Sequence, residues 1–92
     1  MRYLWDPAKD ALNRRKHRLS LADGIPALED PNQESWIDKR FEYGEERIVT
    51  LGLGQQALLY VVSTERDEDS IRIISVRRAE QNETERYDSC RS

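Results

Sequence analysis

Apolar residues in the first third of the chain recur with a helical period, and further on they form short runs typical of strands. Asp6 is a favourable N-cap and Pro7 suits the first helical position, which predicts a helix over residues 7–17. Residues 2–5 are expected to form a short opening strand, in which Trp5 anchors the core.

This first helix is predicted to have two different faces. The apolar spacing i, i+3, i+4 and i+7 is occupied by Ala8, Ala11, Leu12 and Arg15. A polar stripe with the same period contains Lys9, Asn13, Lys16 and His17. We expect the apolar face to pack on a core, which leaves the polar stripe exposed to a ligand.

Two more helices are predicted. Ser20 begins a short one over residues 21–28, and the other spans about residues 81–88, with Asn82 as its cap. In the last helix, Glu83 and Tyr87 lie one turn apart and share a face.

Four strand-length runs lie between the helices, and short links separate them. They are Ser35 to Phe41, Arg47 to Leu53, Gln56 to Thr64 and Ser70 to Arg77. Links this short favour antiparallel neighbours. The predicted fold class is therefore α+β: two N-terminal helices, an antiparallel sheet of about four strands and a short C-terminal helix, in one domain over residues 1–92.

The last strand carries arginines on both of its faces if its side chains alternate regularly. One face then holds Ile71, Ile73, Ser75 and Arg77, and the other holds Arg72, Ile74, Val76 and Arg78. Under this alternation only one of Arg72 and Arg77 shares a site with His17.

Charge is distributed unevenly along the 92 residues, although the net charge is only −3. Residues 1–20 carry +4, residues 21–70 carry −8 and residues 71–92 carry +1. The two basic ends therefore predict one cationic site for a polyanion such as RNA, and the acidic middle fits either a basic protein partner or a solvated surface.

Several functional classes are disfavoured. The longest apolar run, residues 57–62, is too short to cross a bilayer, and no signal-peptide core follows Met1, so a cytoplasmic protein without membrane contact is expected. Cys90 is a lone cysteine, which predicts a free thiol. No metal-ligand spacing and no phosphate-binding glycine loop is present, so neither a cofactor nor a metal is expected.

If the polyanion is RNA and the protein cleaves it without a metal, the reaction needs a proton acceptor for the ribose 2′-hydroxyl, an acid for the leaving oxygen and cations for the phosphate. The only histidine suits proton transfer, and arginine suits the phosphate because its fork donates two parallel hydrogen bonds. The candidate catalytic residues are His17, Lys16, Arg72, Arg77, Arg78, Glu83 and Tyr87, and the candidate RNA-binding residues are Lys9 and Asn13.

Structural alternatives remain open for these residues. His17 is also placed to cap carbonyls at a helix end, and Arg72 to pair with an acidic residue of a neighbouring strand. Glu83 with Tyr87 is equally suited to docking the last helix by pairing with Arg77 or Arg86. The Lys9 and Asn13 stripe either binds the RNA backbone or solvates its helix.

Many short segments, in order and spacing, resemble the BrnT toxins over nearly the whole chain. They are Trp5 to Lys9, Asn13, Lys16-His17, Leu19 to Ala22, Asp30-Pro31, Glu45 to Arg47, Gly52, Leu59 to Val62, Ile71 to Ser75, Arg77 to Ala79, Glu83 and Tyr87. The chain departs from the family where glycine usually follows the Lys-His pair, since it has Arg18, and where a hydroxyl residue usually precedes the last helix, since it has Glu80.

The resemblance implies a type II toxin-antitoxin ribonuclease with a RelE-like fold, which inhibits translation and is neutralised by a BrnA-like antitoxin. It also implies that operator DNA is bound only through the antitoxin complex. The alternative is a noncatalytic RelE-like module that pairs with an antitoxin or with RNA.

Overall fold

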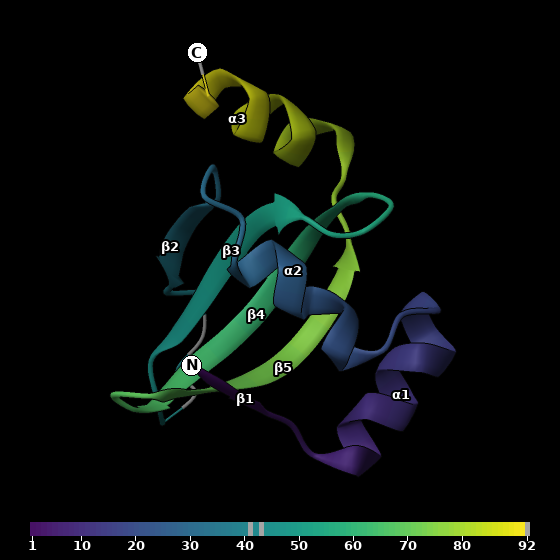
Figure 1. Cartoon of the computed structure of the whole chain (residues 1–92), viewed down its shortest axis with the longest axis vertical. Coiled ribbons are helices and arrows are strands. Elements are labelled where there is room, and N and C mark those ends of the chain that lie inside the picture. Colours follow the sequence, from purple (N-terminus) through teal and green to yellow (C-terminus); the bar gives the residue numbers. More distant parts are fainter. Residues whose placement is uncertain (41, 43, 92) are drawn as a thin grey trace.

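The computed structural model describes residues 1–40, 42 and 44–91, and the side chains of residues 90 and 91 are not among the described parts. Five strands form one sheet in the order β1-β5-β4-β3-β2 (Figure 1). The strands are β1 Arg2–Leu4, β2 Glu34–Asp38, β3 Arg47–Leu53, β4 Leu58–Asp67 and β5 Ser70–Arg78. The helices are α1 Pro7–His17, η1 Leu21–Gly24, α2 Ile25–Leu28 and α3 Gln81–Arg91.

The α+β class and the order of elements are confirmed, but the sheet is mixed rather than antiparallel with about four strands. β1 pairs parallel with β5, and the other neighbours are antiparallel. The parallel pair joins segments at opposite ends of the chain, so no local spacing signals it. β4 also runs beyond Thr64 to Asp67, because its charged end continues to pair with β5. The predicted end of the first long strand, Phe41, lies outside the described residues, as does the Cys90 side chain.

The sheet face covered by η1 and α2 is apolar, and we call it the α2 face. Its core contains Leu21 and Ala27 of the helical segment and Leu59, Val61, Ile73 and Val76 of the strands. The capping box of Ser20 and Asp23 is present, but the predicted single helix is divided into a 3-10 turn and one turn of α-helix. Gly52 allows this close packing, because a Cβ there would lie 2.2 Å from the carbonyl oxygen of Ala27.

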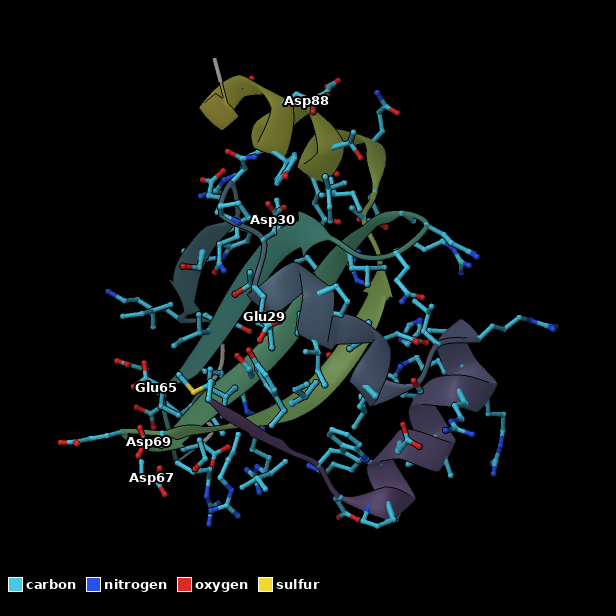
Figure 2. The ribbon with its side chains drawn as sticks, in the orientation of Figure 1. Glu29, Asp30, Glu65, Asp67, Asp69 and Asp88 are labelled. Carbon is cyan, nitrogen blue, oxygen red and sulfur yellow. The ribbon has the colours of Figure 1, made fainter. Side chains whose placement is uncertain are left out.

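The opposite face, the α3 face, carries Val49, Leu51, Tyr60 and Val62 of the strands, packed with Tyr87 of α3. The Tyr87 hydroxyl donates to Asp30 Oδ2 at 2.5 Å. Asp30 follows α2 and lies between the sheet and α3 (Figure 2). This buried bond fixes α3 against one end of the sheet.

Helix α1 packs with the face that the sequence predicted to be exposed. Asn13 is buried, and Asp10 and His17 are half-buried on the same side. Leu12 is 59% exposed, and Ala8 and Ala11 are exposed as well. The prediction was wrong because α1 attaches through hydrogen bonds: Asp10 accepts from the backbone N–H of Leu21 at 2.8 Å, for example. Trp5, at 37% exposure, is also less buried than a core anchor.

The predicted regular alternation of β5 is wrong as well. Val62 pairs with Ser75 and Ser63 with Ile73, so Ile74 is an extra residue in a β-bulge. Beyond the bulge the faces exchange: Val76 joins Ile73 on the α2 face, and Arg77 lies opposite Tyr60 on the α3 face. Arg72, opposite Thr64, is on that same α3 face.

Helix α3 starts one residue before the predicted cap. The Glu83 carboxylate accepts the backbone N–H of Glu80 at 2.7 Å, and Thr84 N–H donates to the Glu80 carbonyl at 2.9 Å. Glu80 therefore occupies the N-cap position in place of Asn82. Glu83 and Tyr87 both face the sheet, as their spacing predicted. Among the described residues, no helix is long and apolar enough to cross a membrane.

Candidate functional site

Asn13 fixes the position of α1 beside β5. Its side-chain amide donates to the carbonyl of Val76 at 2.9 Å and accepts the backbone N–H of Val76 at 3.1 Å. A further bond runs to the carbonyl of Leu19 at 2.8 Å. The amide thus replaces a neighbouring strand on the stretch of β5 that β1 does not reach. The Asn13 amide, a candidate RNA-binding group in the sequence, therefore forms hydrogen bonds within the fold.

His17 lies one turn after Asn13 and lines a hollow of about 460 Å³ on the outer side of β5. Lys9 and Lys16 of α1 and Ser75 of β5 line the same hollow. Within the described part of the chain, the His17 side chain has no hydrogen-bond partner, so it does not cap carbonyls.

The electrostatic surroundings of His17 favour its neutral form. Partial burial lowers the pKa of His17 below its usual value, and the nearby charges of Lys16 and Arg77 lower it further. A neutral imidazole near pH 7 is able to accept a proton. The two ends of the chain lie side by side here, because Lys9, Lys16 and His17 of α1 line the hollow together with Ile74 and Ser75 of β5.

Arg77 is held rigidly on the α3 face. Its guanidinium donates to both carboxylate oxygens of Glu83, each at 2.8 Å, and to the carbonyl of Arg78 at 3.1 Å. The guanidinium carbon lies 3.8 Å from the centre of the Tyr60 ring. With 28% of its side chain exposed, Arg77 is oriented but still reachable from solvent.

This pair is ionised on both sides. The hydrogen bonds with Arg77 lower the pKa of Glu83, although burial opposes the shift. The same bonds raise the pKa of Arg77. Glu83 therefore serves as an anionic clamp for Arg77, and docking of α3 through this pair, left open by the sequence, is realised.

A second hollow, of about 480 Å³, adjoins this pair beneath α3. Trp36 and Tyr60 form its floor with their rings 6.4 Å apart, and Arg86 lies 4.0 Å from the Trp36 ring centre. Arg40 donates to the Tyr60 hydroxyl at 3.4 Å. Sequence reasoning missed these residues. The hydroxyl of Tyr60 could have indicated a role at this hollow. Arg40 lies in the acidic part of the chain, where no sequence feature pointed to it.

The other predicted site residues lie elsewhere. Arg72 donates to the Glu45 carboxylate at 2.8 and 3.1 Å. It thus forms an ion pair, as the structural alternative expected, but Glu45 lies in the link before β3 and not on a neighbouring strand. Arg78 is on the α2 face, and Tyr87 is buried and bonded to Asp30. Of the predicted set, Lys9, Lys16 and His17 line one hollow and Arg77 pairs with Glu83, while Arg77 is near enough to His17 to lower its pKa.

Acidic side chains gather at the opposite end of the sheet. Figure 2 shows Glu65, Asp67 and Asp69 around the β4–β5 turn, far from α3. Among the described residues, no three histidine, cysteine, aspartate or glutamate side chains are grouped so that they would hold a metal ion. The side chains around His17 include the cations of Lys9 and Lys16, which suit an anionic ligand, whereas the charge of Arg77 is paired with Glu83.

Comparison with known proteins places this arrangement in a family. A family model described as the ribonuclease toxin BrnT of a type II toxin-antitoxin system matches residues 5–83. The chain belongs to the BrnT family. Among curated proteins, none matches it.

The fold agrees with that of a solved BrnT toxin. The crystal structure of the Brucella abortus ribonuclease toxin BrnT superposes with a TM-score of 0.69 at 24% sequence identity, over 88% of this chain and 99% of the other. The BrnT family match includes His17, Arg77 and Glu83 and ends before Tyr87. As a BrnT family member, the chain is a toxin-antitoxin ribonuclease toxin by family, and such a family implies an antitoxin partner.

Proposed function

We propose that this chain is an endoribonuclease whose cleavage centre lies between His17 and Arg77. The observation that carries the proposal is that the only histidine lines a hollow beside β5 with Lys9 and Lys16, and that β5 also carries an arginine clamped by Glu83 and Tyr60 whose charge lowers the pKa of this histidine. Membership of a ribonuclease toxin family supports this reading.

In the proposed reaction, neutral His17 accepts the proton of a ribose 2′-hydroxyl, and the resulting oxygen attacks the adjacent phosphorus. The bond from phosphorus to the 5′-oxygen breaks as a cyclic phosphate forms, and the leaving 5′-oxygen takes a proton from water. Arg77 and Lys16 stabilise the negative charge that develops on the phosphate oxygens.

The residues around this pair would position it. Glu83 and Tyr60 hold the Arg77 guanidinium in one orientation before RNA arrives, so little ordering is needed on binding. Lys9 lines the same hollow as His17 and is suited to binding a neighbouring phosphate of the RNA. Glu83 is thus a positioning residue in this proposal, and Arg72 and Tyr87 support the fold.

We also propose the biological setting that the family suggests. A BrnA-like antitoxin neutralises the toxin, RNA cleavage inhibits translation in the cytoplasm, and operator DNA is bound only through the toxin-antitoxin complex. No metal enters the reaction, because an imidazole and cations supply the chemistry that it needs.

The test is RNA cleavage by the purified protein in the presence of a chelator. Replacing His17→Ala or Arg77→Ala should lower the cleavage rate by about 100-fold or more, because each removes one element of the mechanism. An RNA with 2′-deoxyribose at the cleaved position should remain intact, since it lacks the nucleophile.

Arg72→Ala is the matched control. Arg72 lies on the same strand and face as Arg77 and is also paired with a glutamate, but it lies away from His17. The cleavage rate of the Arg72→Ala variant should stay within a few-fold of the wild-type rate. Intact RNA with the folded wild-type protein would reject the nuclease and favour a noncatalytic binding module, in which ion-paired arginines serve structure alone.

A further inference from the structure

A third hollow lies on the α2 face, where α1 ends and β5 ends. It encloses about 340 Å³. Its polar lining comes from Arg18 after α1, Arg78 of β5, Gln55 and Gln56 of the β3–β4 link, and Asp23 of η1. None of the assigned functions uses this hollow.

Two arginines that line this hollow, Arg18 and Arg78, have no carboxylate partner among the described residues. Arg72, Arg77 and Arg86 contrast with them, since each forms an ion pair at 2.8 Å or less. The one carboxylate of the hollow, Asp23, accepts the backbone N–H of Ser20 at 2.8 Å and completes a helix cap. The unpaired charge of Arg18 and Arg78 is therefore available to an anion.

Arg18 occupies a backbone conformation that favours glycine. Its φ is 61°, and its N–H bonds the Arg14 carbonyl at 2.9 Å, a cap that needs no side chain. A non-glycine residue in this region carries a conformational cost. The Arg18 side chain lies beside a hollow shared with Arg78, and neither the helix cap nor an ion pair among the described residues uses its charge.

The hollow is adjacent to the proposed cleavage centre. Arg18 follows His17 and Arg78 follows Arg77 along the chain, so the two sites lie on opposite faces of the same end of β5. Guanidinium and amide groups are hydrogen-bond donors that match the oxygens of a phosphodiester.

We propose that Arg18 and Arg78, with the amides of Gln55 and Gln56, bind a backbone phosphate of the RNA at a position outside the cleaved bond. This site rests on the proposed function for its RNA substrate. This site would hold the RNA where the RNA passes around the end of β5, from one face of the sheet to the other.

The test is binding of a short 2′-O-methyl RNA of mixed sequence, which cannot be cleaved, measured by fluorescence anisotropy. Arg18→Gly and Arg78→Ala should each weaken binding about fivefold, and each should reduce the slope of log Kd against log salt by about 0.7, the contribution of one single-strand phosphate contact. Arg18→Gly should keep or raise the melting temperature, because glycine suits the backbone there. Arg66→Ala, which removes the same charge in the distant β4–β5 hairpin, is the control.

Equal Kd values and slopes for Arg78→Ala and Arg66→Ala would overturn the proposal. Unchanged RNA binding together with weakened antitoxin binding would also overturn it and assign the hollow to a protein partner. A third outcome separates the two proposals. If the wild-type protein binds RNA but leaves unmodified RNA intact, and the two variants still show the reduced salt slope, this site is supported while the nuclease is rejected.

Discussion

Two helical segments attach to the same sheet by different physical means. The η1–α2 segment packs through Leu21 and Ala27, both fully buried, and Gly52 lets its backbone come close. Helix α1 instead attaches through polar groups, chiefly the Asn13 amide on Val76 and the Asp10 carboxylate on Leu21. Its apolar residue Leu12 faces solvent.

The difference separates stability from positioning. Apolar burial is non-directional and supplies most of the folding free energy. Hydrogen bonds add less net stability, but they fix distance and orientation. Helix α1 carries His17, and its attachment through Asn13 sets the register of His17 against Arg77 on β5. The helix with the candidate site is thus the one held by directional contacts.

The largest expected effect concerns two leucines on these segments. Leu21→Ala should lower the free energy of unfolding by about 3 kcal/mol, because it leaves a cavity at a fully buried site. Leu12→Ala should change it by less than about 0.5 kcal/mol, since the side chain is mostly exposed. Urea unfolding monitored by circular dichroism measures both. A similar loss for the two variants would mean that α1 also packs through its apolar face.

A smaller effect is expected from the polar attachment. Asn13→Ala should destabilise the protein by about 2 kcal/mol, because it leaves the buried backbone groups of Val76 without partners. Hydrogen exchange of the Val76 amide should accelerate, and RNA cleavage should fall as His17 loses its register. Lys9→Ala, on the same helix but exposed, is the control for stability. Unchanged exchange at Val76 would contradict the role given to the amide.

The smallest effect concerns protonation of His17. NMR titration should give a His17 pKa below about 6.5, and Arg77→Ala should raise it by removing a nearby positive charge. Because the folded state holds this proton less tightly than the unfolded state, stability should increase as pH rises from the folded pKa to about 6.5. Above that window the histidine contributes no further pH dependence. A pKa unchanged by Arg77→Ala would separate the two residues and weaken the proposed centre.

Much of the fold was readable because its signals are local. The Asp6 cap, the Ser20 capping box and the run of β3 depend on neighbours a few residues away, and the structure confirms them. A shared function for the two basic ends stays a prediction, but their closeness, with α1 and β5 lining one hollow, was anticipated from charge. The set of residues around them was not, because Tyr60 and Arg40 reach the site from strands and loops distant in sequence.

The sequence alone determined the α+β class, the order of elements and the BrnT family, since these follow from local periodicity and short motifs. The tertiary structure decided which side of α1 is buried and which arginines share a face. A side-chain amide that satisfies a strand edge, and a bulge that shifts a strand by one residue, reverse the simple apolar and alternating patterns. Both arise from partners more than sixty positions away or from strand register, and periodicity records neither.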